Sequence, residues 1–351
     1  MIVSVRDTDW DGVRLHVVTG KGGTGKTTVA AALALALASG GKRVLLMEVE
    51  GRQGIAQLFD VPPLPYEERR VAVAPADDGR PGGDVFALVA DPQSAMLEYL
   101  EMFYNLRQAG RALTKLGVMD FATTIAPGLR DVLLTGKAAE AVRRKKSGNP
   151  VYGAVVMDAP PTGRIGRFLN VTTEVSGLAK VGPIRTHADT VQNVIRSPQT
   201  VVHFVTTLEE MPVQETLDGI KELRELGDGG IRPGGIMVNM MRSLSLSDGD
   251  LTTAAVQAGK LETGTPASHA RDARALAVAL KAAGLGDDPQ LSDDLMAELA
   301  DEARTARAQL EQRKQLDVAG QPCYELPLIS DGMDLAGLYR LAAALREQGA
   351  G

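Results

Sequence analysis

Hydrophobic residues along the chain fall into short continuous runs separated by longer segments with helical periodicity. The runs are rich in Val, Ile and Leu and do not alternate with polar residues, so each predicts a strand buried on both faces. They lie at residues 13–18, 43–50, 84–90, 152–158, 200–206, 234–239 and 323–328. Because helical segments separate these strands, the pattern predicts an α/β fold built on a doubly wound, mostly parallel sheet.

Two stretches of helical pattern do not fit this simple alternation. Residues 91–150 and 164–199 are expected to form one helical subdomain inserted into the sheet domain. Residues 242–320 contain an amphipathic helical stripe and are expected to form a helical excursion before the last strand. The sheet domain then comprises residues 1–90, 151–163 and 200–351.

Composition and charge narrow the class of protein. With 351 residues, 44% of them hydrophobic, the chain can bury a substantial core. A formal net charge of -6 argues against a general nucleic-acid or anionic-membrane binder. The single cysteine, Cys323, excludes an internal disulfide or a cysteine-built metal site and fits a cytoplasmic protein. The longest apolar run, 29–38, is too short to span a bilayer, so no integral membrane segment is expected.

A glycine-rich loop follows the first predicted strand and precedes a predicted helix. The segment "GKGGTGKT", residues 20–27, satisfies G-x-x-x-x-G-K-[ST]. In such a loop backbone N–H groups surround phosphate oxygens, the lysine reaches the outer phosphates and the hydroxyl binds Mg²⁺. The residues expected to bind nucleotide are Gly20, Gly22, Gly23, Thr24, Gly25, Lys26, Thr27 and Thr28.

An acidic residue ends the fourth predicted strand. Asp158 closes "YGAVVMD" and is followed by the loop "APPTG", which is marked by proline and glycine. A phosphate-loop enzyme requires a carboxylate at the end of a neighbouring strand to hold the Mg²⁺ water shell. Thr27 and Asp158 are therefore the expected Mg²⁺ ligands, although a strand-end Asp can also act only as a cap.

The loop "KGGTGKTT", together with "DAPPTG", resembles the ArsA family of anion-transporting ATPases, whose phosphate loop is deviant and carries a signature lysine. That family includes the arsenite-pump ATPase and the guided-entry ATPase for tail-anchored proteins. The resemblance extends over most of the chain, through "EVEGRQGIAQLFD", "TTLEEMPVQET" and "ELPLISDGMDLAGL", and is strongest to actinobacterial ArsA-like proteins. It implies MgATP hydrolysis by two nucleotide domains that meet face to face. The partner would be a second copy or a related ArsA-like subunit.

The resemblance also suggests roles for individual residues. Lys21 lies too early in the loop to be the phosphate-loop lysine and is expected to reach the partner's phosphates; the alternative is a solvated loop residue. Glu50 lies where better-known members carry the Asp of Asp-Pro-Ala-His, which polarises the attacking water. Glu48 and Gln53 are other candidates for that role, and the change from Asp to Glu leaves the efficiency of hydrolysis open. Lys21, Lys26 and Glu50 are the expected catalytic residues.

The nucleotide base is expected to be adenine. The chain contains no N-K-x-D or T-K-x-D segment of the kind that pairs with guanine. The resemblance places Asn239 beside the base, and the loop that begins near Pro327 completes the pocket. A turn-forming role at the end of a strand is the alternative for Asn239.

Three functions remain in competition at this point. The first is an ATP-driven dimeric switch that acts on a client or partner protein through the helical subdomain. The second is a regulatory subunit that binds ATP, hardly hydrolyses it and pairs with an ArsA-like paralogue. The third, less favoured, is a partition-type positioning ATPase, which requires a basic DNA-binding face or a basic amphipathic helix. The basic run 143–146, "RRKK", either contacts an acidic partner or is a solvated loop, and the second interpretation is favoured.

Overall fold

The computed structural model describes residues 9–76, 79–104, 127–171, 183–226, 229–242, 266–284 and 289–351. The chain divides into two compact units. The first comprises residues 1–207, 211–241 and 319–351, and contains the sheet and the phosphate loop. The second comprises residues 208–210 and 242–318.

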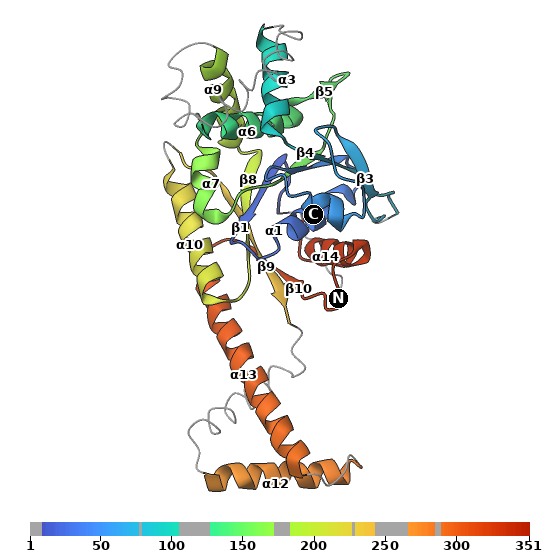
Figure 1. Cartoon of the computed structure of the whole chain (residues 1–351), viewed down its shortest axis with the longest axis vertical. Coiled ribbons are helices and arrows are strands. Elements are labelled where there is room, and N and C mark those ends of the chain that lie inside the picture. The colour runs from blue at the N-terminus through green and yellow to red at the C-terminus, as the bar shows by residue number, and fades with distance from the viewer. Residues whose placement is uncertain are drawn as a thin grey trace. The chain divides into compact units, whose positions relative to one another are not determined.

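The first unit is built on an eight-stranded sheet in the order β10-β9-β8-β1-β7-β2-β4-β3 (Figure 1). All neighbours pair in parallel except β3 and β4, which are antiparallel. The strands are β1 (Leu15–Gly20), β2 (Val44–Glu48), β3 (Arg69–Val73), β4 (Asp84–Val89), β7 (Ala154–Asp158), β8 (Thr200–Thr206), β9 (Pro233–Met241) and β10 (Cys323–Pro327). This mostly parallel α/β sheet confirms the predicted fold class.

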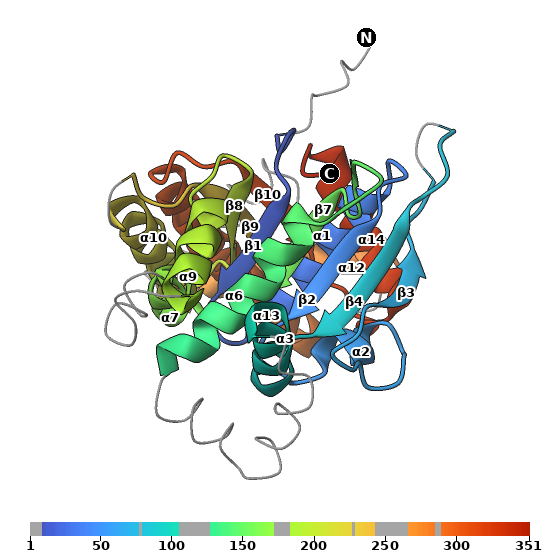
Figure 2. The same ribbon diagram turned by 90° about the horizontal axis from the view of Figure 1, so that it is seen from above.

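Helices cover both faces of the sheet, as a doubly wound fold requires (Figure 2). Helix α1 (Lys26–Ala38) packs on β2 and β7 and on α14 (Leu335–Glu347), whereas α6 (Pro127–Arg143) packs on β1 and β7 and on α9 (Pro183–Ile195). The remaining helices of this unit are α2 (Gly54–Leu58), α3 (Pro92–Tyr104), α7 (Thr162–Leu169) and α10 (Glu210–Glu225). A two-stranded hairpin, β5 (Lys145–Lys146) and β6 (Asn149–Pro150), follows α6.

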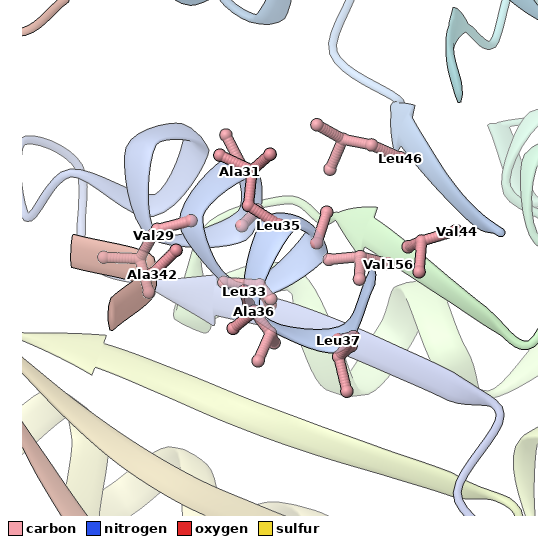
Figure 3. Packing of buried hydrophobic residues seen from close by; sticks show 14 of the residues in the cluster. Val29, Ala31, Leu33, Leu35, Ala36, Leu37, Val44, Leu46, Val156 and Ala342 are labelled. Carbon is pink, nitrogen blue, oxygen red and sulfur yellow. The ribbon is translucent and has the colours of Figure 1, made fainter. Parts of the chain in front are cut away.

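The main core lies between the sheet and α1. Every residue of α1 from Val29 to Ala38 is buried, because α1 is enclosed by the sheet and by α14. Figure 3 shows Leu35 of α1 near Val156 of β7, with Ala342 of α14 on the opposite side of the helix. The apolar run 29–38 is therefore a core helix. Within the described residues, no helix combines the length and apolarity needed to cross a bilayer.

The run of residues in β7 shows why continuous apolar sequences mark the central strands. Val156 belongs to the core cluster that contains α1, whereas Val155 and Met157 are equally buried and point to the face that α6 covers. A strand buried on both faces therefore has few polar positions in its sequence. The edge strand β3 has no such run, and its first two residues, Arg69 and Arg70, are exposed.

Helices α3, α6 and α9 lie in the stretches 91–150 and 164–199, in which a helical subdomain was expected, and α7 begins two residues before the second stretch. Helix α6 packs on α3, α7 and α9 and also directly on the sheet. Residues 105–126 and 172–182 of these stretches lie outside the described part of the chain. The second unit contains α12 (Pro266–Ala282) and α13 (Pro289–Asp317), which pack on each other.

Candidate functional site

The phosphate loop connects the carboxyl end of β1 to the first turn of α1. Two of its glycines lie where no side chain fits. A Cβ on Gly20 would lie 2.2 Å from the backbone oxygen of Val205, and one on Gly25 would lie 2.4 Å from Nδ2 of Asn239. Gly25 also has a φ of +84°, which disfavours residues with a side chain. The close packing of the loop against β8 and β9 therefore requires glycine at both positions.

Thr27 and Asp158 meet at the end of this loop. The Thr27 hydroxyl donates a hydrogen bond of 2.7 Å to Oδ2 of Asp158. Strand β7 pairs with β1 so that Val18 lies opposite Asp158, which places the carboxylate at the edge where α1 begins. Asp158 is 7% exposed, and its other oxygen, Oδ1, is buried without a hydrogen-bond partner in the described structure.

Burial raises the pKa of Asp158 to about 6. The hydrogen bond from Thr27 and the positive charge of Lys26 act in the opposite direction, and the negative charges of Glu48 and Glu50 add to the increase. A buried carboxylate with one unpartnered oxygen beside a hydroxyl is a donor set that fits Mg²⁺, a hard cation that prefers oxygen ligands. Within the described residues, no group of three or more His, Cys, Asp or Glu side chains could hold a metal. That is compatible with Mg²⁺, which is usually held by few protein ligands, phosphate oxygens and water.

The end of β2 and the segment after it contain the three residues considered for orienting water. Glu48 is 2% exposed, and its carboxylate accepts hydrogen bonds from the backbone of Gln53 (2.6 Å) and Ile55 (3.1 Å). Glu48 thus satisfies free N–H groups at the start of α2. The Gln53 side chain donates to the Leu64 backbone oxygen (3.1 Å) and accepts from the Leu64 N–H (2.8 Å). Both side chains are therefore engaged in holding this segment in place.

Glu50 has a different environment. Its carboxylate is 21% exposed and forms an ion pair of 3.4 Å with the exposed guanidinium of Arg52. Its charge acts on Asp158, as the raised pKa of Asp158 records. The side chains of Glu48 and Gln53 form hydrogen bonds with the backbone. Within the described residues, the Glu50 side chain forms none.

Lys21 forms an ion pair within its own chain. Its Nζ lies 2.9 Å from Oε1 of Glu215 on α10, and both side chains are about one-third exposed, at 30% and 37%. Thr24 tethers this part of the loop by donating to the Lys21 backbone oxygen (2.9 Å). A partly exposed ion pair contributes little free energy, so this contact can be exchanged for another anion at low cost.

Asn239 lies at the end of β9 and holds the phosphate loop. Its Nδ2 donates to the Thr24 backbone oxygen (2.9 Å), and the residue is 5% exposed. Pro327 lies at the end of the adjacent strand β10, where it pairs with Met241. The carboxyl ends of β1, β7, β9 and β10 thus bring the phosphate loop, Asp158, Asn239 and Pro327 to one edge of the sheet.

A small cavity of about 80 Å³ next to Glu50 was not anticipated from the sequence. It is lined by Glu50 and Arg52 from the segment after β2, by Arg130 and Asp131 from the first turns of α6, and by Arg164 from α7. Arg164 directly follows "DAPPTG" in the sequence. Its position beside this motif could have indicated that Arg164 lies near the site. Nothing in the sequence around Arg130 indicated that the start of α6 lies there.

Comparisons with known proteins agree with this geometry. The family model described as anion-transporting ATPase matches residues 13–195. The chain is 51% identical to ATPase BagA of Mycobacterium tuberculosis over 339 residues, which cover 96% of this chain and 94% of that protein. It is 30% identical to ATPase get3 of Schizosaccharomyces japonicus over 48% of this chain and 49% of that protein. It is 26% identical to the arsenical pump-driving ATPase of Acidiphilium multivorum over 60% of this chain and 36% of that protein. The chain therefore belongs to the anion-transporting ATPase family typified by ArsA.

Proposed function

We propose that this protein is a MgATP-driven switch that works as a dimer, with a second copy or with a related ArsA-like subunit. ATP binds between the phosphate loop and the ends of β7, β9 and β10, and its hydrolysis changes the conformation presented to a client or partner protein. The hydrogen bond between Thr27 and Asp158 is the observation that carries this proposal. It unites the phosphate loop with the buried carboxylate that a nucleotide-bound Mg²⁺ needs.

In this proposal different residues of the phosphate loop bind the phosphates and Mg²⁺. The N–H groups at the start of α1 face the phosphates, and the helix dipole favours their negative charge. Lys26 contacts the outer phosphates, and the side chains of Thr27 and Asp158 hold Mg²⁺ directly or through water. When bound, the ion neutralises charge on the phosphate oxygens.

Glu50 is the residue proposed to orient the attacking water. Glu48 and Gln53 already bond to the backbone of the same segment, so neither can turn toward water without releasing it. Within the described residues, the carboxylate of Glu50 pairs only with Arg52, through a long ion pair of 3.4 Å. Movement of Arg52 to a phosphate would free the carboxylate of Glu50.

Lys21 is proposed to complete the site of the partner subunit. In the single chain it pairs with Glu215, which neutralises its charge while no partner is present. When two nucleotide domains meet, Lys21 exchanges Glu215 for the partner's phosphates and stabilises the charge that develops as the outer phosphoryl group leaves. This exchange would couple dimer formation to hydrolysis.

Helix α6 is proposed to transmit the change in nucleotide state. Its first turns line the cavity beside Glu50 and Arg52, and its length packs on α3, α7 and α9. A helix is a rigid element, so movement of the Glu50 segment at one end displaces the surface at the other. The helices around α6 would present that change to the client.

A second candidate is a regulatory subunit that binds ATP and hardly hydrolyses it. The ion pair between Glu50 and Arg52 favours this alternative, because a carboxylate held by an arginine is less available to water. Such a chain would need an ArsA-like paralogue to supply the missing catalytic group.

Steady-state hydrolysis of MgATP tests these proposals, with nucleotide binding measured on the same samples. The variants are Lys26→Ala and Lys21→Ala, and the control is Lys146→Ala on the exposed β5–β6 hairpin. We expect Lys26→Ala to lose binding, Lys21→Ala to bind without turnover, and the control to match the unsubstituted protein. Turnover that persists in both loop variants would exclude the switch mechanism. Binding without turnover in the unsubstituted protein would favour the regulatory subunit.

A further inference from the structure

A large groove lies at the edge of the sheet opposite the phosphate loop. Arg14 and Gln199 immediately precede the parallel neighbours β1 and β8, whereas the phosphate loop follows the other end of β1. Six residues of strand place the groove about 20 Å from the loop. The groove has a volume of about 700 Å³ and is lined by Arg14, Val142, Arg143, Lys145, Thr190, Asn193, Val194, Ser197 and Gln199.

The groove has a strong excess of positive charge. Arg14, Arg143 and Lys145 contribute three cationic side chains, and none of the described residues that line it is acidic. The whole chain carries a formal net charge of -6, so this concentration is local. Within the described part of the chain, Arg143 and Lys145 form no ion pair. The intervening Arg144 behaves differently, because Glu68 and Glu140 both bind its guanidinium.

Structural roles do not account for all three cations. Arg143 ends α6, where a positive charge interacts favourably with the helix dipole. Arg14 and Lys145 are on no helix: Arg14 precedes β1 and donates to the Tyr152 backbone oxygen (2.8 Å), and Lys145 is in β5. The turn of that hairpin has positive φ angles at Ser147 and Gly148, as a tight hairpin turn requires. Lys145 is thus presented at the groove by a defined turn.

The remaining lining residues indicate which kind of anion fits. The described lining includes no aromatic side chain, so these residues offer no stacking surface for nucleic-acid bases. Among the described lining residues, only Val142 and Val194 are apolar, which is too little apolar surface to insert into a membrane or to form a typical small-molecule pocket. Thr190, Asn193 and Gln199 can hydrogen-bond to a peptide backbone. Carboxylates on an extended chain match both the cations and these polar groups.

We propose that this groove binds an acidic peptide segment of a partner protein. The Asp and Glu side chains of the segment pair with Arg14, Arg143 and Lys145, and its backbone bonds to the polar residues of α9 and of the loop before β8. The site is separate from the nucleotide site and does not depend on hydrolysis. The basic run 143–146, for which a solvated loop was the favoured interpretation, then has two roles: Arg144 is structural, while Arg143 and Lys145 bind the partner.

Fluorescence anisotropy of a labelled peptide rich in Asp and Glu tests the proposal with the full chain. The matched probe has Asn and Gln at the acidic positions. The test variant is Lys145→Glu, at an exposed hairpin position, and Arg143→Gln is a second variant that introduces no negative charge. The control is Arg340→Glu, which makes the same charge change at an exposed position of α14. Circular dichroism and nucleotide binding establish that each variant folds.

We expect the acidic peptide to bind and the amide peptide not to bind. Reversing one charge in a partly exposed site weakens binding about fivefold to tenfold, so Lys145→Glu should show this loss and Arg340→Glu a change of less than about twofold. Added salt should weaken the interaction. Equal binding of the two peptides, or equal losses in Lys145→Glu and Arg340→Glu, would overturn the proposal. It would also be overturned if DNA or phosphatidylserine vesicles bound through Lys145 while the acidic peptide did not.

Discussion

The hydroxyl of Thr27 donates a 2.7 Å hydrogen bond to the carboxylate of Asp158, joining the first turn of α1 to the end of β7. The two residues are 131 positions apart in the chain. The contact results from the parallel pairing of β1 and β7, which aligns the start of α1 with the last residue of β7. Because this carboxylate is buried and its other oxygen has no hydrogen-bond partner among the described residues, the proposed binding of Mg²⁺ would depend on its state of ionisation.

Binding of Mg²⁺ with nucleotide should therefore depend on pH near the pKa of Asp158, which is about 6. A metal ion binds the ionised carboxylate, so protons compete with it below this pKa. We expect the apparent affinity for Mg²⁺ to rise with pH and to level off above about pH 7, with a loss approaching tenfold per pH unit below the pKa. Titration of nucleotide affinity with Mg²⁺ at several pH values measures this. An equal pH dependence in Asp158→Asn would contradict the assignment.

Because the carboxylate of Asp158 is buried, we expect Asp158→Asn to stabilise the folded protein when Mg²⁺ is absent. The pKa of Asp158 is higher in the folded state than the ordinary value of 3.8, so the folded state binds more protons between the two values. The ionised carboxylate thus destabilises the fold increasingly as pH rises through this window, by about 3 kcal/mol at most. Asn keeps an acceptor for Thr27 without the charge. We expect the variant to be more stable than the unsubstituted protein by about 1–3 kcal/mol at neutral pH and to lose this advantage near pH 4.

Chemical denaturation at pH 4 and at neutral pH, without divalent cations, measures that difference. A stabilisation that is the same at both pH values would show that packing, and not charge, is responsible. Thr27→Val is the matched control, because it removes the hydrogen bond and leaves the buried charge. It should be less stable than the unsubstituted protein at neutral pH.

Glu48 and Glu50 should respond differently to loss of charge, although they are two residues apart. Glu48 accepts two backbone hydrogen bonds at the start of α2, so Glu48→Ala should lower stability by about 1–2 kcal/mol. Among the described residues Glu50 pairs only with the exposed guanidinium of Arg52, so Glu50→Gln should change stability by less than about 0.5 kcal/mol while it removes most of the turnover. Thermal unfolding and MgATP hydrolysis of both variants separate the two roles. Full turnover in Glu50→Gln would remove Glu50 from the proposed mechanism.

The different contacts of Glu48 and Glu50 show where sequence-based prediction ends. The central strands were predictable because burial on both faces leaves only apolar residues, as in β7, and the glycine pattern predicted the phosphate loop. The role of Glu48 depends on the turn that follows it, in which Gly51 and Gln53 have φ angles of +69° and +60°. That turn brings two N–H groups back to the carboxylate, and residue type alone does not specify it. The cavity beside Glu50 likewise forms where the segment after β2 meets α6 and α7, which are distant from that segment in sequence.

Two histidines buried in the sheet should make the protein sensitive to acid. Nε2 of His203 lies 3.0 Å from Nδ1 of His16, and the Gly235 N–H donates to Nδ1 of His203. His203 is then the donor and His16 the acceptor within the pair. Burial lowers the pKa of His16 to about 3 and that of His203 well below its ordinary value of 6.5. Both rings are therefore neutral in the folded protein, while in the unfolded chain each binds a proton below about pH 6.5.

Between about pH 6.5 and pH 3 the unfolded state thus binds more protons, so stability falls with falling pH by up to about 1.4 kcal/mol per pH unit for each histidine. His16→Phe removes one of the two histidines, so the fall in stability per pH unit should be smaller than in the unsubstituted protein. The variant should be less stable at neutral pH, because the ring N–H of His203 loses its hydrogen-bond acceptor. Denaturation of both proteins across this range gives the two slopes. Parallel curves would mean that the pair does not remain neutral in the folded protein.

Glycine substitutions in the phosphate loop should separate close packing from nucleotide binding. A Cβ on Gly25 would meet Nδ2 of Asn239 at 2.4 Å, on a backbone with a φ of +84°. A Cβ on Gly22 would meet nothing within 4 Å. Gly25→Ala should therefore break the hydrogen bond from Asn239 to the Thr24 backbone oxygen and lower stability by about 1–3 kcal/mol without nucleotide. The stability of Gly22→Ala should stay within about 0.5 kcal/mol of that of the unsubstituted protein.

Thermal unfolding without ligand compares the two variants, and equal destabilisation would show that the loop does not pack on Asn239 as described. Adding Asn239→Ala to Gly25→Ala should recover part of the loss, since it removes the clash and leaves the strain of the positive φ and the lost hydrogen bond to Thr24.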